Sequence, residues 1–335
     1  MSRVERTVRI LREDDVRASI DMAACIEACD RAFAAYSRGG AELPGVIHLD
    51  VPEHSGEIHV KAGHLHDAPF YAVKVASGFP GNVELGRPAN DGMVIVFDAQ
   101  TGVPAALLLD NGFLTDLRTG AAGGVAAKYL APQQVSTVAV IGTGVQAGYQ
   151  LDALALVRPG FTSVRVWGRD AGHAAACVAD LGARAGLPEG CRYEVAGSVE
   201  QAVDGADVVI TCTASRTALL RPDWLKLGAH VTALGSDGAN KQELDPTVLT
   251  RAALLVVDSR EQCARIGELH HALQAGLIDA RETVELGEIC GRSHLGRTSP
   301  NQLTVCDLTG LGVQDAAAAN FVMANAGTRG DLIAL

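Results

Sequence analysis

A glycine-rich turn lies in VAVIGTGVQAGYQ, at positions 138–150, and its spacing suits phosphate binding. An apolar strand is expected before it and a helix after it, which is the context that a dinucleotide fingerprint requires. Gly142 permits a tight turn, Gly144 lets the backbone approach a pyrophosphate, and the small Ala147 permits close helix–strand contact. Free N–H groups of the first helical turn face the anion. We predict a dinucleotide site formed by Gly142, Thr143, Gly144, Val145, Gln146 and Ala147.

The choice of cofactor depends on the end of the next predicted strand, VRVWGRD at 164–170. An NAD-binding chain places Asp or Glu there to bind the ribose hydroxyls, whereas here Arg169 follows the strand. A guanidinium suits a 2′-phosphate, so NADP(H) is favoured and NAD(H) is the alternative. In that alternative Arg169 is solvated and Asp170 binds the ribose. A further strand ends in TCTASRT and predicts a cofactor-lining loop with Thr211, Thr213 and Ser215, unless this polar loop makes no contact.

Three cations lie in otherwise apolar or small-residue stretches: Lys61 in EIHVKAG, Lys74 in FYAVKVASGFPGN and Arg118 in LTDLRTGAAG. A buried cation needs a partner, and a substrate carboxylate would serve. Arginine binds a carboxylate through two parallel hydrogen bonds. The alternative for each cation alone is a solvated strand face.

A candidate acid or base is Asp237, which follows an apolar strand in HVTALGSDGANKQELD. A carboxylate at the carboxyl edge of a parallel sheet is well placed for proton transfer. A turn-forming aspartate beside Gly238 is the alternative, and the spacing alone does not choose between the two readings.

The elements that position these residues form two regions, which differ in their predicted pattern of strands and helices. Residues 45–110 contain successive strands without intervening helices, which predicts a mostly antiparallel sheet or barrel. A strand and a helix capped by Asp21 precede them, and a small-residue helix is expected over 115–131. From residue 136, strands alternate with helices, which predicts a Rossmann-type doubly wound parallel sheet. An Ala-rich helix over 313–327 is expected to pack back on the first part, so the α/β chain would contain a discontinuous α+β domain.

Composition excludes several classes of protein. The 335 residues carry 28 Lys+Arg against 39 Asp+Glu, a net charge of −11, and the pI is near 5.3. A nucleic-acid partner is not expected without a concentrated basic face. No stretch reaches the roughly 18 apolar residues of a membrane helix, and the charged N-terminus lacks a signal-peptide core, so a cytoplasmic protein is expected.

Neither the cysteines nor the histidines predict a metal site. The eight cysteines contain no CxxC pair. Cys25 and Cys29 share a helix face, as a redox or metal pair or as two small buried residues, and the second reading is favoured. His270 and His271 are adjacent, so on a helix their side chains point about 100° apart. In DLTGLGVQD, at 307–315, a helix-capping turn and an approach of Thr309 or Gly310 to a nicotinamide both stay open.

Eight segments in order, spread over nearly the whole chain, resemble the ornithine cyclodeaminase/μ-crystallin family: YAVKVASGFPGN, FDAQTGVPAALLLDNGFLTDLRTGAAGG, VAVIGTGVQAGYQLDAL, VRVWGRD, ADVVITCTAS, GAHVTALGSDGANKQELD, GELHHAL and GLGVQDAAAA. Five segments are most similar to the ectoine-utilisation branch: HVKAG, LVRP, GSDGANK, GELHHALQAGL and DLTGLGVQD. The resemblance implies a homodimer. It also implies a substrate-binding and dimerisation domain over 1–125 and 312–335, and a dinucleotide domain over 126–311.

The same resemblance implies residue roles. Lys74 matches the active-site lysine of the family and Arg118 matches the arginine that binds the substrate carboxylate. Asp237 matches the catalytic aspartate near the reacting nitrogen, and Thr115 and Asn82 match positions that line the same pocket.

One departure from the family lies in ELPGVIHLDV, where the ornithine-type enzymes carry an arginine after the proline and this chain has Gly45 and Val46. Lys61 would replace that charge. The leading hypothesis is therefore an NAD(P)H-dependent ketimine reductase or amino-acid dehydrogenase that acts at the Cα–N bond. Ornithine cyclodeaminase, which forms L-proline and ammonia from L-ornithine, is the alternative, and a non-catalytic μ-crystallin-like binding protein is the third.

Overall fold

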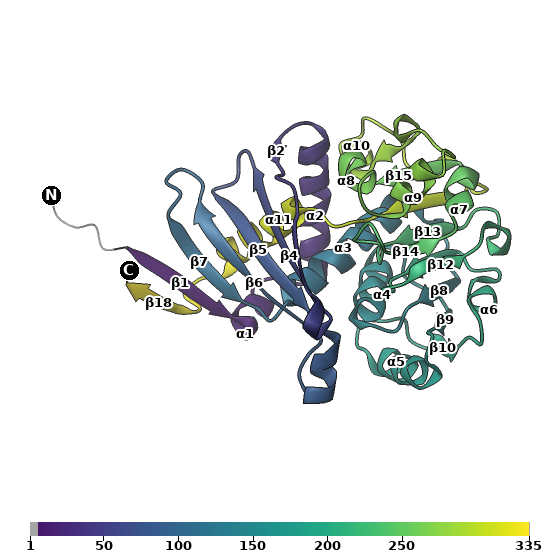
Figure 1. Ribbon diagram of the computed structural model, residues 1–335, viewed down its shortest axis with the longest axis horizontal. Coiled ribbons are helices and arrows are strands. Elements are labelled where there is room, and N and C mark those ends of the chain that lie inside the picture. Colours follow the sequence, from purple (N-terminus) through teal and green to yellow (C-terminus); the bar gives the residue numbers. More distant parts are fainter. Residues whose placement is uncertain (1–5, 335) are drawn as a thin grey trace. The chain divides into compact units, whose positions relative to one another are not determined.

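The computed structural model describes residues 6–334, which divide into two compact units. The first unit joins the residues up to Arg118 with those from Leu311 onward, and the second unit is Thr119–Gly310. Figure 1 shows the first unit built from the purple and blue start of the chain together with its yellow C-terminal end. The division after Arg118 falls inside helix α3, which runs unbroken from Phe113 to Leu130 and so also contains position 125, where the first segment was predicted to end.

A mostly antiparallel sheet is the centre of the first unit. Among the described residues its strand order is β18-β1-β7-β6-β5-β4-β2, and β3 also pairs with β4. The β1–β7 pair is parallel, while β4 to β7 form antiparallel neighbours as predicted. The strands are β1 Thr7–Arg12, β2 Ala41–Glu42, β3 Ile47–Val51, β4 Gly56–Leu65, β5 Phe70–Gly78, β6 Asn90–Asp98, β7 Pro104–Leu109 and β18 Asp331–Ala334.

Helix α11 (Gly312–Asn325) packs against β4, β5 and α2, which brings the end of the chain onto the first sheet (Figure 1). Glycine makes this approach close, because a Cβ on Gly312 would lie 2.1 Å from the Ala62 carbonyl oxygen of β4. The return of the chain was expected as a helix alone, but β18 follows it and pairs antiparallel with β1.

The second helix of the first unit begins where the sequence predicts. Asp21 caps α2 (Met22–Ser37) by accepting a hydrogen bond from the Ala24 N–H at 2.8 Å, as predicted. Cys25 and Cys29 are both buried in α2. The short elements are α1 Glu13–Arg17, η1 Pro52–His54 and η2 Pro80–Leu85.

The second unit contains the predicted Rossmann-type sheet. Within residues 6–334 its strand order is β10-β9-β8-β11-β13-β17-β15-β16, and each neighbouring pair is parallel. Its central strands β8 and β11 are mostly apolar, and every residue in them except Thr137 is buried, as a sheet covered on both faces requires. The strands are β8 Thr137–Ile141, β9 Ser163–Trp167, β10 Arg192–Val195, β11 Val208–Thr211, β13 His230–Ala233, β15 Leu254–Val257, β16 Val284–Glu285 and β17 Thr304–Asp307.

Two features of this unit are not predicted from the sequence. Strand β17 lies between β13 and β15, and no strand was predicted at its position. A small parallel pair, β12 (Arg216–Leu220) and β14 (Gln242–Leu244), stands apart from the main sheet. The strands β12, β14 and β17 are short and contain polar residues, so no long apolar run in the sequence marks them.

Helices alternate with these strands. They are α3 Phe113–Leu130, α4 Val145–Val157, α5 Ala171–Ala183, α6 Val199–Val203, α7 Pro246–Arg251, α8 Arg260–Cys263, α9 Glu268–Gln274 and α10 Leu286–Cys290, with η3 Pro222–Trp224 and η4 Ala280–Glu282. No helix in the described part of the chain combines the length and apolarity needed to cross a membrane.

Candidate functional site

The turn between β8 and α4 has the geometry of a phosphate-binding loop. Gly142 adopts a φ of 133°, and a Cβ there would lie 2.7 Å from the Cys212 carbonyl oxygen. Only glycine fits such a position. Gly144 precedes α4 as its N-cap without a side-chain cap, and nothing lies within 4 Å of the place where its Cβ would be. The start of this helix therefore has no side-chain cap and leaves open space beside Gly144, which suits a bound pyrophosphate.

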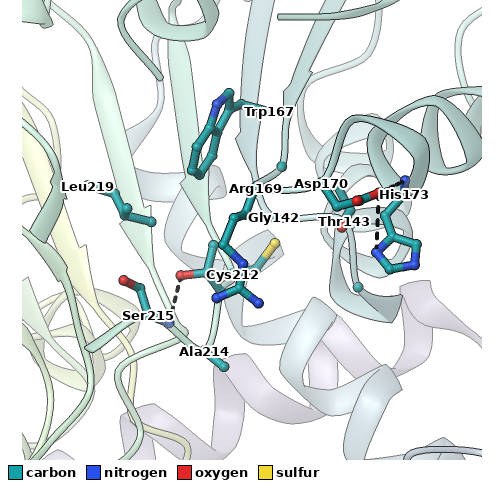
Figure 2. Close-up of a pocket in the computed structure, with 13 residues that line it drawn as sticks. Gly142, Thr143, Trp167, Arg169, Asp170, His173, Cys212, Ala214, Ser215 and Leu219 are labelled. Atoms are coloured by element: carbon teal, nitrogen blue, oxygen red, sulfur yellow. Dashed lines mark hydrogen bonds and ion pairs between the residues drawn. The ribbon is translucent and has the colours of Figure 1, made fainter. Parts of the chain in front are cut away.

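A cavity of about 410 Å³ adjoins this turn and is lined by three segments of the second unit. These are the turn at 142–144, the segment from the end of β9 into α5 and the loop after β11 (Figure 2). Thr143, Arg169, Thr213 and Ser215 line it as predicted. This dinucleotide cleft lies at the carboxyl ends of the parallel strands, where ligands of doubly wound folds bind.

Four predicted cofactor residues do not line the cleft. Thr211 does not line the cleft, because its side chain is fully buried and its hydroxyl donates to Glu243 at 2.7 Å. Ala147 is also buried, where its small side chain permits the packing of α4. Val145 and Gln146 occupy the first turn of α4 and are not among the residues that line the cleft.

The end of β9 carries the residues that bear on cofactor choice. Asp170 caps α5 by accepting a hydrogen bond from the His173 N–H at 2.8 Å, and this bond lowers the pKa of its carboxyl. Arg169 is exposed at the cleft, and within residues 6–334 it makes no hydrogen bond or ion pair. Its guanidinium is therefore available to an anion.

Asp237 lies two residues beyond Gly235 in the loop that follows β13. Its Oδ1 forms an ion pair with Lys241 Nζ at 2.8 Å, and the Asp237 side chain is 39% exposed. The Ser236 hydroxyl donates to the Lys241 carbonyl oxygen at 2.6 Å, which closes the loop on itself. The carboxylate is thus held at the surface of the second unit by a cation of its own loop.

Buried carboxylates hold the loops at this edge of the sheet. Asp258 accepts hydrogen bonds from the N–H groups of Thr309 and Gly310, at 2.8 and 2.7 Å. Asp307 accepts one from the Leu269 N–H. With burial as the main cause, the pKa of Asp307 rises to about 7 and that of Glu268 to about 9. We call Glu243, Asp258, Glu268 and Asp307 the acid frame; sequence reasoning missed all four.

The histidine pair bonds within this unit. His270 Nδ1 lies 3.0 Å from the Ala264 carbonyl oxygen, and His271 Nε2 lies 2.7 Å from that of Lys241. The two rings thus contact different carbonyl oxygens, as side chains that diverge on a helix do.

The three predicted cations gather in the first unit around a carboxylate that the sequence did not reveal. Lys61 and Lys74 are directly opposite each other in the β4–β5 pair. Asp315 of α11 binds Lys74 Nζ at 3.1 Å and Arg118 Nε at 3.0 Å, both through Oδ1. All four side chains are buried. We call Lys61, Lys74, Arg118 and Asp315 the cation cluster.

The charges of the cluster shape its titration. Burial and the nearby Arg118 charge lower the pKa of Lys74 to about 7, although Asp315 opposes the shift. Burial disfavours the ionised form of Asp315, yet Arg118, Lys74 and Lys61 together hold its pKa below the ordinary value. The cluster therefore keeps an ionised Asp315 and a lysine that titrates near neutrality.

Several polar atoms in and beside the cluster have no hydrogen-bond partner in the described part of the chain. Among the described residues, the Arg118 side chain donates only through Nε, so the two nitrogens of its fork make no hydrogen bond. The buried Asp315 Oδ2 and Asp110 Oδ1 also lack a hydrogen-bond partner in this part of the chain. A buried, open guanidinium fork fits a carboxylate, which would offer it two acceptor oxygens.

The last two predicted substrate-binding residues lie on α3 and in η2. Thr115 lies on α3 one turn before Arg118, on the same helix face. Asn82 lies in η2, where its Nδ2 donates to the Pro88 carbonyl oxygen at 3.2 Å. No hydrogen bond joins Asn82 to the cation cluster among the described residues.

Comparison with known proteins places this geometry in a family. The sequence model of the ornithine cyclodeaminase/mu-crystallin family matches residues 6–330. An uncharacterised cyclodeaminase of Sinorhizobium fredii is 42% identical over 329 residues, covering 96% of this chain and 97% of the relative. The iminosuccinate reductase of Paracoccus denitrificans is 32% identical over 94% of this chain and 95% of the relative.

Solved structures agree with this assignment. The Δ1-pyrroline-2-carboxylate reductase of Thermococcus litoralis, in complex with NADH and L-proline, has a TM-score of 0.88 and 30% identity, over 95% of this chain and 97% of that chain. An archaeal alanine dehydrogenase dimer with bound NAD has a TM-score of 0.88 and 33% identity, over 98% and 99%. The chain therefore belongs to the ornithine cyclodeaminase/mu-crystallin family.

Proposed function

We propose that this protein is an NAD(P)H-dependent reductase of a small α-imino acid, and that it also catalyses the reverse oxidation of the amino acid. The open guanidinium fork of Arg118 in the buried cation cluster carries this proposal. The similar proteins named above act on, or bind, small amino and imino acids, and two of the structures contain NADH or NAD. The glycine turn and the uncapped start of α4 fit such a dinucleotide.

In this proposal the residues of the chain have distinct roles. Arg118 and Lys61 bind the carboxylate of the substrate, and Thr115 and Asn82 line the same pocket. When bound, the dinucleotide supplies the hydride that is added to the imine carbon, and becomes NAD(P)⁺. Lys74 or Asp237 gives a proton to the nitrogen, so the C=N bond becomes an amine C–N bond with one hydride and one proton added.

We infer that NADP(H) is the preferred cofactor. Arg169 supports this inference, since it lines the dinucleotide cleft and has no polar partner in the described chain. Asp170, the carboxylate that would bind ribose hydroxyls, already accepts a hydrogen bond from the backbone of α5. A 2′-phosphate would pair with the free guanidinium.

We also infer a homodimer formed through the first unit. Ile47 and Leu49 on β3 and Leu332 on β18 are more than half exposed, which is unusual for large apolar side chains on a sheet. The archaeal alanine dehydrogenase that this chain resembles is described as a dimer. Sedimentation equilibrium tests the inference: twice the chain mass supports it, and a monomer at micromolar concentration contradicts it.

Cyclodeamination of L-ornithine is the second candidate, because a relative that is 42% identical is named a cyclodeaminase. A panel of assays separates the two functions. We expect NADPH or NADH to be consumed with Δ1-pyrroline-2-carboxylate, iminosuccinate, or pyruvate plus ammonia. Ammonia release from L-ornithine with catalytic NAD⁺ and no net redox change would favour the cyclodeaminase. No consumption of either cofactor across the panel would contradict the reductase.

A further inference from the structure

Glu243 of β14 stands out among the buried groups because its single carboxylate binds two separate loops. Its side chain is fully buried. Oε1 accepts hydrogen bonds from the Thr213 N–H at 2.6 Å and from the Thr213 hydroxyl at 2.7 Å. Oε2 accepts them from the Thr211 hydroxyl at 2.7 Å and from the Gly235 N–H at 2.8 Å. Every one of these donors lies in or next to the loops after β11 and β13.

Those two loops carry the parts of the second unit that the proposed reaction uses. Strands β11 and β13 are parallel neighbours, so both loops leave the sheet at the same edge. Thr213 lines the dinucleotide cleft. Gly235 lies two residues before Asp237. Glu243 is therefore hydrogen-bonded both to the loop that lines the dinucleotide cleft and to the loop that carries Asp237.

The backbones of the two loops pack closely against each other at Gly235. A Cβ on Gly235 would lie 2.1 Å from the Thr213 carbonyl oxygen and 2.6 Å from the carboxyl carbon of Glu243. Since no real Cβ makes such contacts, the two loops touch through bare backbone. A shift of one loop must consequently move the other or break its bond to Glu243.

Glu243 is itself held in place by a second member of the acid frame. The N–H groups of Glu243 and Leu244 donate to Glu268 Oε1 and Oε2, at 2.7 and 3.0 Å. In the part of the chain that the structure describes, neutral groups alone supply the four donors to the Glu243 carboxylate, in place of a cation. Directional hydrogen bonds of this kind fix geometry more tightly than a mobile ion pair does.

We propose that Glu243 is a positioning residue, which sets the distance between the loop that lines the dinucleotide cleft and the loop that carries Asp237. The part of this inference that concerns Asp237 rests on the proposed function. Catalysis is sensitive to such positioning, because a displacement of about 1 Å at a reacting group costs on the order of a hundredfold in rate.

The test is the variant Glu243→Gln, which keeps the shape but offers one acceptor oxygen where two are needed. Amide hydrogen exchange is the first readout. We expect faster exchange at both Thr213 and Gly235, and a Kd for NADPH or NADH that rises about tenfold. With saturating dinucleotide, kcat should also fall about tenfold or more.

Glu268→Gln is the matched control, since it removes an acceptor of the same frame but contacts neither loop. It should speed exchange at Glu243 and Leu244 and lower the melting temperature, with smaller effects on Kd and kcat. If both variants only lower the melting temperature, with Kd, kcat and exchange at Thr213 and Gly235 like the wild type, Glu243 is merely structural and the proposal is overturned.

Thr211→Val provides a second route if Glu243→Gln does not fold. It removes one bond to Oε2 and does not line the cleft. Faster exchange at Gly235 supports the proposal, and unchanged exchange there overturns it. Failure of the proposed function is recognised separately: a wild-type chain that binds NADPH but reduces no imino acid fails that proposal, while hydrogen exchange and the dinucleotide Kd still decide the role of Glu243.

Discussion

Asp315 binds Lys74 and Arg118 through a single oxygen, Oδ1. This arrangement neutralises part of the buried positive charge and holds the Arg118 guanidinium by Nε alone. Among the described residues, the other two guanidinium nitrogens make no hydrogen bond and form a flat pair of donors. The carboxylate binding that we propose depends on this planar pair as well as on charge.

Arg118→Lys tests that dependence, because lysine keeps the charge and loses the planar fork. We expect kcat/KM for the imino acid to fall about tenfold or more, chiefly through a higher KM. Steady-state kinetics at saturating NADPH measure it, with the exposed Arg31→Lys on α2 as the matched control. A wild-type KM in Arg118→Lys would contradict the assigned role.

Arg169→Ala tests the choice of cofactor. Loss of the guanidinium should raise the Kd for NADPH about tenfold, because a charge-assisted bond to the 2′-phosphate disappears. The Kd for NADH, measured by the same fluorescence titration, should change little and serves as an internal control. Equal changes in both constants, or no change in either, would speak against NADP(H) as the preferred cofactor.

Lys74 predicts a pH dependence. Burial, followed by the Arg118 charge, lowers its pKa to about 7. If Lys74 gives the proton to nitrogen, reduction requires its charged form and slows as the pH rises through about 7, whereas amino-acid oxidation speeds up. Profiles of kcat for both directions check this. A reduction rate that stays flat from pH 6 to about 8.5 would exclude Lys74 as the proton donor and leave Asp237.

At the scale of elements, the acid frame supports the loops at the carboxyl edge of the Rossmann-type sheet. Burial, with Asp307 and Glu243 nearby, raises the pKa of Glu268 to about 9 from an ordinary value of 4.5. Folded Glu268 thus keeps its proton at pH values where the unfolded chain has lost it. Its contribution to stability is complete below pH 4.5 and disappears as the pH rises through about 9.

Glu268→Gln should therefore flatten the loss of stability between pH 5 and about 9, because glutamine has no proton to release. Urea unfolding at a series of pH values gives the free energy of unfolding for the variant and the wild type. The free energy of unfolding of the variant should still fall with pH, but less steeply than that of the wild type, because the pKa of Asp307 is also raised, to about 7. A variant slope identical to that of the wild type would show that Glu268 is ionised in the folded chain.

The sequence predicts those elements whose signals are local. The Asp21 cap, the Gly142 turn and the alternation of strands and helices each depend on residues a few positions apart, and the structure contains all three. Asp315 could not be recognised, since its partner Arg118 is 197 positions away and its own segment is an ordinary Ala-rich helix. Glu243 was hidden in the same way, in a strand of three residues that no apolar run marks.

At the scale of the whole molecule, the chain passes through its first unit twice. The early strands supply Lys61 and Lys74, and the returning helix α11 supplies Asp315. The second unit, inserted in the sequence, supplies the dinucleotide cleft and Asp237. The groups proposed to bind the substrate carboxylate thus belong to one unit, and the dinucleotide cleft belongs to the other.

Transfer of an isotope tests this central claim most directly. NADPH deuterated at the transferable C4 position is incubated with Δ1-pyrroline-2-carboxylate and the enzyme, and the product is analysed by mass spectrometry and NMR. The account predicts proline with a single deuterium at Cα and one NADP⁺ formed per proline. Proline without deuterium, or no proline from this or any other imino acid with either cofactor, would contradict it.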